Sequence, residues 1–117
     1  PPARPEDEVL AALESARVAW RAQDWPNVER VLAPGATVLG LPRDTVIEQL
    51  RSESFRTSPP ALTILFAEAM GDAATMRATL TMPASGGEAP LERQIEIVWA
   101  KVAGSWGVTG AEDAARE

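Results

Sequence analysis

The spacing of apolar residues predicts helices at the start of the chain. In residues 6–23 the apolar positions recur at helical spacing, and acidic residues fill the first turn, where the helix dipole favours negative charge. A short second helix is expected after Asp24, which suits an N-cap, with Pro26 in the first turn. The segment Ala-Pro-Gly at 33–35 is expected to end this helix.

A short strand and a third helix are expected next. Residues 36–41 have the composition of a short strand, and residues 42–54 carry apolar side chains on one helical face. Residues 55–60 end in two successive prolines, which cannot continue a helix, so they are expected to form a loop.

From residue 61 the period of the pattern changes to two, which predicts strands. Segments 61–70 and 73–82 flank Gly71-Asp72, and segments 93–102 and 105–110 flank Ala103-Gly104. Both dipeptides suit two-residue hairpin turns. Residues 83–92 are expected to form a long, turn-rich loop. The predicted fold class is therefore α+β, with helices packed on one face of a curved antiparallel sheet.

The two turns set the register, and the register sets which side chains share a face. One face, expected to be concave and to meet the helices, holds Leu65, Ala67, Ala69, Met76, Ala78, Leu80, Met82, Ile95, Ile97, Trp99, Trp106 and Val108. The other, convex face holds Leu62, Ile64, Phe66, Glu68, Thr75, Arg77, Thr79, Thr81, Gln94, Glu96, Val98, Ala100 and Thr109. A slip of one residue at either turn would exchange these sets.

This order of elements resembles the NTF2-like superfamily, whose α+β cone fold is also called SnoaL-like or cystatin-like. The resemblance rests on the long first helix, QDWPNVERVLAPGATVLG at 23–40, DTVIEQL at 44–50 and VWAKVAGSWGVTG at 98–110. It covers about residues 7–111. We expect one NTF2-like domain over 6–111, a Pro-rich linker or tether at 1–5 and a polar tail at 112–117. The resemblance predicts little chemistry, because the superfamily contains both enzymes and non-catalytic binding domains.

Several residue types that enzymes of this superfamily use are missing. The chain has no His, no Tyr and no Cys. Isomerases of the superfamily use a Tyr and a protonated acid with an Asp base, and segment 36–41 offers no acid for such a base. We therefore expect no catalytic residues, no cofactor and no metal site. An enzyme is not the favoured interpretation.

Charge and hydropathy limit the partners. The formal net charge is −6, from 11 basic and 17 acidic residues, and the basic residues are scattered, so nucleic-acid binding is not expected. No apolar run reaches the roughly 18 residues of a membrane span. A cytoplasmic location is favoured over an exported, tethered one, in which residues 1–8 would form the tether.

The leading hypothesis is a non-catalytic binding or dimerisation domain, within a larger bacterial protein, that forms a homodimer through the convex face. Glu68 and Arg77 lie diagonally there and could pair. The interface candidates are Ile64, Phe66, Glu68, Arg77, Thr79, Glu96 and Val98. The alternative is a SnoaL-like small-molecule-binding protein, or a lyase or isomerase, that holds an apolar ligand in the cone. The candidates for that pocket are Trp20, Leu39, Met76, Met82, Trp99 and Trp106.

Overall fold

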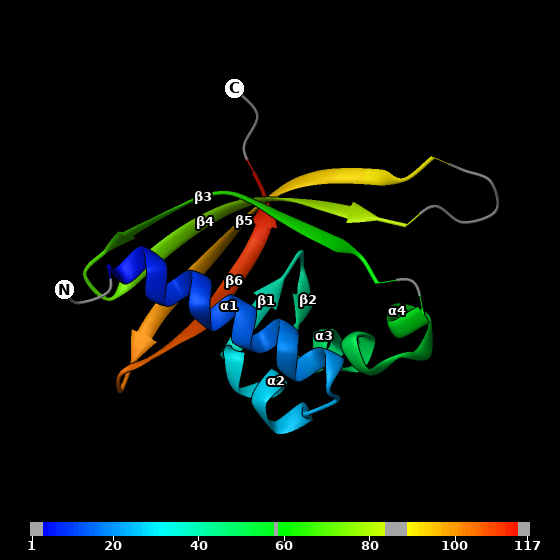
Figure 1. Ribbon diagram of the computed structural model, residues 1–117, viewed down its shortest axis with the longest axis horizontal. Helices are drawn as coiled ribbons and strands as arrows, with labels where there is room; N and C mark the ends of the chain where they lie inside the picture. The colour runs from blue at the N-terminus through cyan, green and yellow to red at the C-terminus, as the bar shows by residue number, and fades with distance from the viewer. Residues whose placement is uncertain (1–3, 58, 84–88, 115–117) are drawn as a thin grey trace.

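A curved six-stranded sheet arches over four helices in the computed structural model, which describes residues 4–57, 59–83 and 89–114 (Figure 1). The helices are α1 (Pro5–Arg21), α2 (Trp25–Val31), α3 (Arg43–Arg51) and α4 (Glu53–Thr57). The strands are β1 (Leu32–Val38), β2 (Leu41–Pro42), β3 (Ala61–Met70), β4 (Ala73–Met82), β5 (Leu91–Val102) and β6 (Ser105–Asp113). The predicted α+β class is confirmed.

The strand order in the sheet is β2-β1-β6-β5-β4-β3. Neighbouring strands are antiparallel except β1 and β6, which run parallel. The helices lie on the concave side, and no described helix lies on the convex side of β3, β4 and β5 (Figure 1). One face of the sheet therefore meets the helices, and the other is left open.

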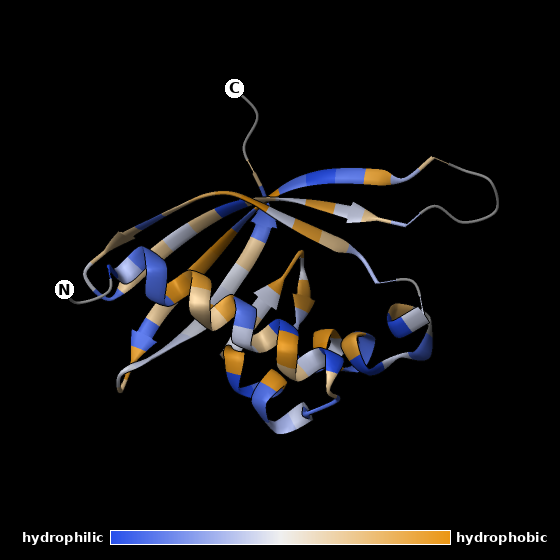
Figure 2. Cartoon of the chain, in the orientation of Figure 1, coloured by the Kyte–Doolittle hydropathy of each residue, from blue (hydrophilic) through white to orange (hydrophobic). Residues whose placement is uncertain are grey.

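Both long hairpins turn where the sequence predicts. Met70 pairs with Ala73 across Gly71-Asp72, and Val102 pairs with Ser105 across the second turn. The predicted helix-facing residues of the second hairpin are all buried: Ile95, Ile97, Trp99, Trp106 and Val108. Apolar and polar residues alternate along these strands (Figure 2).

A β-bulge in β3 corrects the predicted faces of the first hairpin. Ile64 pairs with Ala78, but the next pair is Phe66 with Arg77, so Leu65 is an extra residue. A bulge reverses the alternation along its strand. Leu62 and Ile64 therefore pack against the core, and Leu65 and Phe66 are both exposed. The placement of Leu62 and Ile64 on the convex face and of Leu65 on the concave face was wrong.

Several element boundaries also differ from the predicted ones. The expected third helix breaks at Ser52, whose backbone is extended (φ −65°, ψ 147°). A separate helix, α4, then takes in the last two residues of the expected helix and residues 55–57 of the expected loop. The strand β1 starts directly after α2, so Pro34-Gly35 lies within a strand. The first helix starts inside the expected linker, and β6 continues two residues into the expected tail. Residues 84–88 of the expected loop lie outside the described residues.

The core lies between α1 and the concave face of the sheet. Val9 on α1, Met76 on β4 and Trp99 on β5 have no exposed surface. Small residues such as Ala74 and Ala78 are buried beside them and allow the helix to approach the strands. Close packing of this kind between a helix and a sheet supplies most of the stability of a small domain.

The β5–β6 turn contains a strained residue whose relief should stabilise the fold. Ala103 is exposed and has a φ of 53°, in the left-handed region that a Cβ disfavours. We expect Ala103→Gly to raise the free energy of unfolding by about 0.5–1 kcal/mol, measured by urea denaturation. Ala73→Gly, at an exposed strand position, is the control and should lower it. A lower stability for Ala103→Gly would contradict this account of the turn.

Candidate functional site

The convex face of β3, β4 and β5 is the most apolar exposed surface of the sheet. Its large exposed side chains are Leu65 (49% exposed), Phe66 (46%), Met70 (87%), Val98 (36%) and Val102 (71%). Along the strands of a sheet with one face in water, the residues on that face are normally polar. Contiguous exposed apolar side chains of this kind mark association surfaces in soluble proteins.

Arg77 lies at the centre of this face and joins three strands. Its Nη2 donates to Glu96 Oε2 across the β4–β5 pair at 3.3 Å, and its guanidinium carbon lies 5.8 Å from the centre of the Phe66 ring on β3. Both charged side chains are about two-thirds shielded from solvent, which strengthens their attraction. Within the described part of the chain, the buried Arg77 Nε has no hydrogen-bond acceptor. A buried donor without a partner is destabilising.

The structure places six of the seven interface candidates on the convex face, and it moves one. Phe66, Glu68, Arg77, Thr79, Glu96 and Val98 share that face through the observed register. Ile64 is turned toward the core by the bulge, whereas the adjacent Leu65 is exposed and was missed. Arg77 pairs with Glu96, its direct neighbour in the register, rather than with the diagonal Glu68.

The free edge of the sheet at β3 is partly occupied by side chains of α1. Arg17 Nη2 donates to the Leu62 carbonyl oxygen at 2.6 Å, and the Ala69 amide donates to Glu6 Oε2 at 3.3 Å. An edge strand offers unpaired backbone groups to other chains, and side-chain caps and bulges reduce that tendency. The β3 edge carries both side-chain caps and a bulge, so the convex face of the sheet is better suited to association than this edge.

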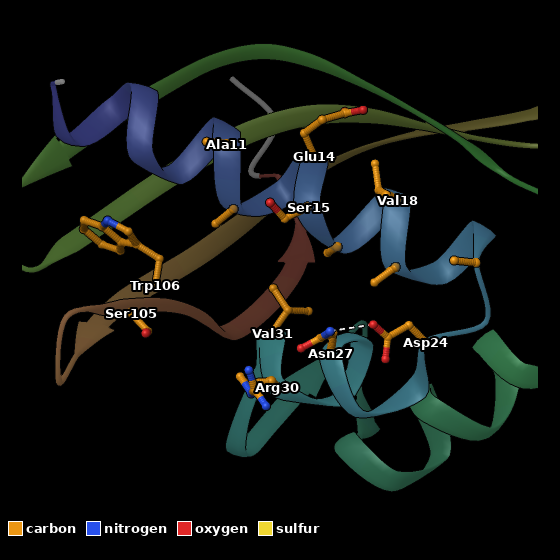
Figure 3. A pocket seen from close by; sticks show the side chains of 14 residues that line it. Ala11, Glu14, Ser15, Val18, Asp24, Asn27, Arg30, Val31, Ser105 and Trp106 are labelled. Carbon is orange, nitrogen blue, oxygen red and sulfur yellow. Dashed lines mark hydrogen bonds between the residues drawn. The ribbon is translucent and has the colours of Figure 1, made fainter.

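A second surface feature is an open groove between α1, α2 and the start of β6, with a volume of about 820 Å³ (Figure 3). Asp24 occupies the predicted N-cap position of α2, but its carboxylate accepts from the Asn27 side chain instead of a backbone amide (Figure 3). The groove is lined by Ala11, Ala12, Glu14, Ser15, Ala16, Val18, Ala19, Ala22, Asp24, Asn27, Arg30, Val31, Ser105 and Trp106.

Of the six pocket candidates, only Trp106 lines this groove. Met76 and Trp99 are fully buried in the core. Leu39 is half-buried against the core in the β1–β2 turn, and Trp20 Nε1 donates to the Leu50 carbonyl oxygen at 2.7 Å. Met82 is half-buried near the far end of β4. Met76 and Trp99 therefore belong to the packed core, and Trp20, Leu39 and Met82 lie at separate places around it.

One charged cluster fastens α1 to the second hairpin. Glu8 Oε1 accepts from both Lys101 Nζ and Trp106 Nε1, each at 3.1 Å. The hydrogen bond from Trp106, then the hydrogen bond and charge of Lys101, lower the pKa of the Glu8 carboxyl. Lys101 is the only lysine of the chain. In the same way, the hydrogen bond from Arg93 lowers the pKa of Asp113.

The Glu8 contact predicts a pH-dependent stability. A lowered pKa in the folded state means that Glu8 stabilises the fold above its unfolded pKa of about 4.3, and that this contribution is lost as the pH falls through the lower folded value. Glu8→Gln should therefore be less stable than the unmodified chain at pH 7, and the difference should shrink at pH 3. Urea midpoints at both pH values measure this. Glu48→Gln, an exposed change on α3, is the control and should show no such pH-dependent difference.

The described residues contain neither a cluster of metal-ligating side chains nor a membrane-spanning helix. No three acidic side chains there come close enough together to hold a metal ion. No helix in the described ranges is both long enough and apolar enough to cross a membrane. The two carboxyl groups with shifted pKa values are shifted downward, which is the opposite of what a general acid at neutral pH requires.

The helices under one curved sheet, the strand order and the open convex face define an α+β domain with the NTF2-like fold. Solved structures confirm this fold. An NTF-2 like protein of unknown function from Shewanella oneidensis is similar over 96% of this chain and 100% of its own, at 12% identity and a TM-score of 0.70. No protein-family model and no curated protein sequence matches the chain.

Two further solved structures of this fold carry descriptions that concern assembly. The CaMKII hub of S. rosetta is similar over 99% of this chain and 100% of its own, at 19% identity and a TM-score of 0.72. A predicted calcium/calmodulin dependent protein kinase II association domain from Xanthomonas campestris is similar over 93% and 86%, at 20% identity and a TM-score of 0.64. At these identities the likeness establishes the fold.

Proposed function

We propose that this chain is a non-catalytic association domain that forms a homodimer through the convex face of its sheet. The observation that carries the proposal is the cluster of exposed apolar side chains on a face that no described helix covers. Met70, Val98 and Val102 are large and exposed and lie around the Ala73–Ala100 pair, and Phe66 lies beside Arg77 on the same face. Burying them against a second copy would remove apolar surface from water.

The polar residues of this face are also suited to an interface. Arg77 and Glu96 neutralise each other within one chain, so a partner would not have to compensate an isolated charge. Arg is enriched at the cores of protein interfaces, together with aromatic residues such as Phe66.

The edge of the sheet and the comparisons support the same proposal. Arg17 and Glu6 occupy backbone groups at the β3 edge, which favours contact through the face. A hub domain and an association domain are among the solved structures with this fold. A face-to-face contact between two sheets follows the usual packing of β-sandwiches.

The association role is proposed in preference to an apolar ligand held in the cone. A ligand site would need an enclosed cavity with a few convergent polar groups. Met76 and Trp99 instead fill the interior, and the described groove is open and lies outside the sheet, between α1 and α2. The chain also has no His, Tyr or Cys to provide the usual catalytic groups.

Light scattering behind a size-exclusion column tests the proposed function. At micromolar concentrations the unmodified chain should elute with the mass of two chains, and dilution should shift it toward one chain. A mass of one chain at micromolar concentrations would contradict the proposal. A mass above two chains would show that the convex face is not the only association surface.

A further inference from the structure

The convex face divides into two chemically different halves along β4 and β5. The half next to the two hairpin turns is here called the turn half. On β4 and β5 it contains only uncharged residues, Ala73, Thr75, Val98, Ala100 and Val102, and on β3 it adds Met70 and the exposed Glu68. The other half, here called the acidic half, contains Thr79, Thr81, Glu92, Gln94, Glu96 and Glu112. Arg77 and Glu96 mark the boundary between them.

We propose that the twofold axis of the homodimer passes through the turn half, near Ala100, so that the two acidic halves point away from each other. This inference rests on the proposed function, because it assumes that two copies meet through the convex face. It adds the position of the contact and hence the residues that each copy presents to the other.

The symmetry of a dimer makes the charge distribution decisive. In a twofold contact the surface nearest the axis meets its own copy, so a like-charged patch on the axis faces itself. Glu92 and Glu112 are exposed in the acidic half, and Arg77, the basic residue of the described convex face, is already paired with Glu96. An axis through the acidic half would bring these carboxylates against their own copies, where like charges are repulsive.

The turn half presents the opposite chemistry to the axis. Met70 and Val102 are its most exposed side chains, and Val98 and Ala100 continue the apolar surface along β5 toward Arg77. None of these side chains loses a hydrogen bond on burial. A contact centred on Ala100 would bury this apolar surface first, because Glu68, the charged residue of this half, lies two strands away on β3. Charges are depleted at the core of an interface and are tolerated at its rim.

Two matched spin labels can locate the axis. The chain has no cysteine, so one introduced cysteine carries one label. Ala100 and Glu92 lie on the same strand and the same face, each four residues from Glu96 and so about 13 Å along β5 on either side of it. In a twofold dimer the distance between two equivalent labels is twice their distance from the axis. Double electron–electron resonance on Ala100→Cys and on Glu92→Cys measures both distances.

The proposal expects the distance between labels at position 100 to be clearly shorter than that at position 92. If the bulk of the label at Ala100 dissociates the dimer while the label at Glu92 does not, sedimentation of the labelled proteins shows it, and that result also supports the proposal. Equal distances, or a shorter distance at position 92, would overturn the axis position while the dimer stands. An unmodified chain that sediments as a monomer would instead overturn the proposed function itself.

Discussion

Val98→Glu is expected to dissociate the dimer, with an increase in Kd of at least about a hundredfold. Val98 lies on the convex face of β5, next to the Arg77–Glu96 pair, and is only 36% exposed in the single chain. The substitution would place two new carboxylates, one from each copy, in a contact that excludes water. A loss of about 3 kcal/mol is in the range of hot-spot residues at the centre of an interface, and each 1.4 kcal/mol is tenfold in Kd.

The matched control for this substitution is Val18→Glu. Val18 is more exposed, at 55%, and lies on α1, on the opposite side of the sheet (Figure 1). The same chemical change there should leave Kd within a few-fold of that of the unmodified chain. Circular dichroism checks that both variants are folded. Equal effects of the two substitutions on Kd would contradict the assignment of the convex face as the interface.

Trp99→Ala is expected to lower the free energy of unfolding by about 3–5 kcal/mol, the range measured for large aromatic residues truncated in protein cores. Trp99 has no exposed surface and packs at the centre of the core with Met76 and Val9. Small domains are stable by only about 5–15 kcal/mol, so this variant would be near the limit of folding. Chemical denaturation measures the change.

Two other tryptophan variants separate the causes of this effect. Trp25→Ala is the control for size. Trp25 is half-buried on α2, and the guanidinium carbon of Arg51 lies 5.3 Å from the centre of its ring. This substitution should lower the free energy of unfolding far less than Trp99→Ala. Trp99→Phe tests the indole N–H, because Trp99 Nε1 is buried with no acceptor among the described residues. The decrease in the free energy of unfolding for Trp99→Phe should be well under half of the decrease for Trp99→Ala. A loss for Trp99→Ala below about 1 kcal/mol would contradict the packing of the core.

Much of the fold follows from local chemistry that the sequence shows directly. The change of period at residue 61, together with the dipeptides Gly71-Asp72 and Ala103-Gly104, is enough to place both hairpins and their turns. The second hairpin keeps its predicted register from the turn to the pair Trp99–Val108, and Thr109 is then an extra residue, so that Val98 pairs with Gly110. The residues of β5 that were predicted to face the core are nevertheless buried, because polar and apolar residues alternate from Gln94 to Ile97.

The bulge in β3 could not be placed from the sequence, because Leu62, Ile64, Leu65 and Phe66 are all apolar and either face would accept them. The helix break at Ser52 has no proline or glycine to mark it, and the Ser52 hydroxyl stabilises the new turn by accepting from the Phe55 amide. Such side-chain bonds to the backbone compete with a continuous helix.

The candidate interface was predicted in outline and corrected in detail. Alternation alone was sufficient to group Phe66, Arg77 and Val98 on one face, but the bulge exchanged Ile64 for Leu65. The Arg17 contact to Leu62 spans 45 residues and depends on how α1 crosses the sheet, so no local pattern indicates it. On its α1 side the groove is lined mainly by alanines, which in a sequence indicate only a favourable helix.

Sedimentation equilibrium of the unmodified chain beside Val98→Glu, at micromolar concentrations and in the same buffer, tests the central claim most directly. We predict the mass of two chains for the unmodified protein and the mass of one chain for the variant. A single-chain mass for the unmodified protein, or a two-chain mass for both proteins, would contradict a homodimer formed through the convex face.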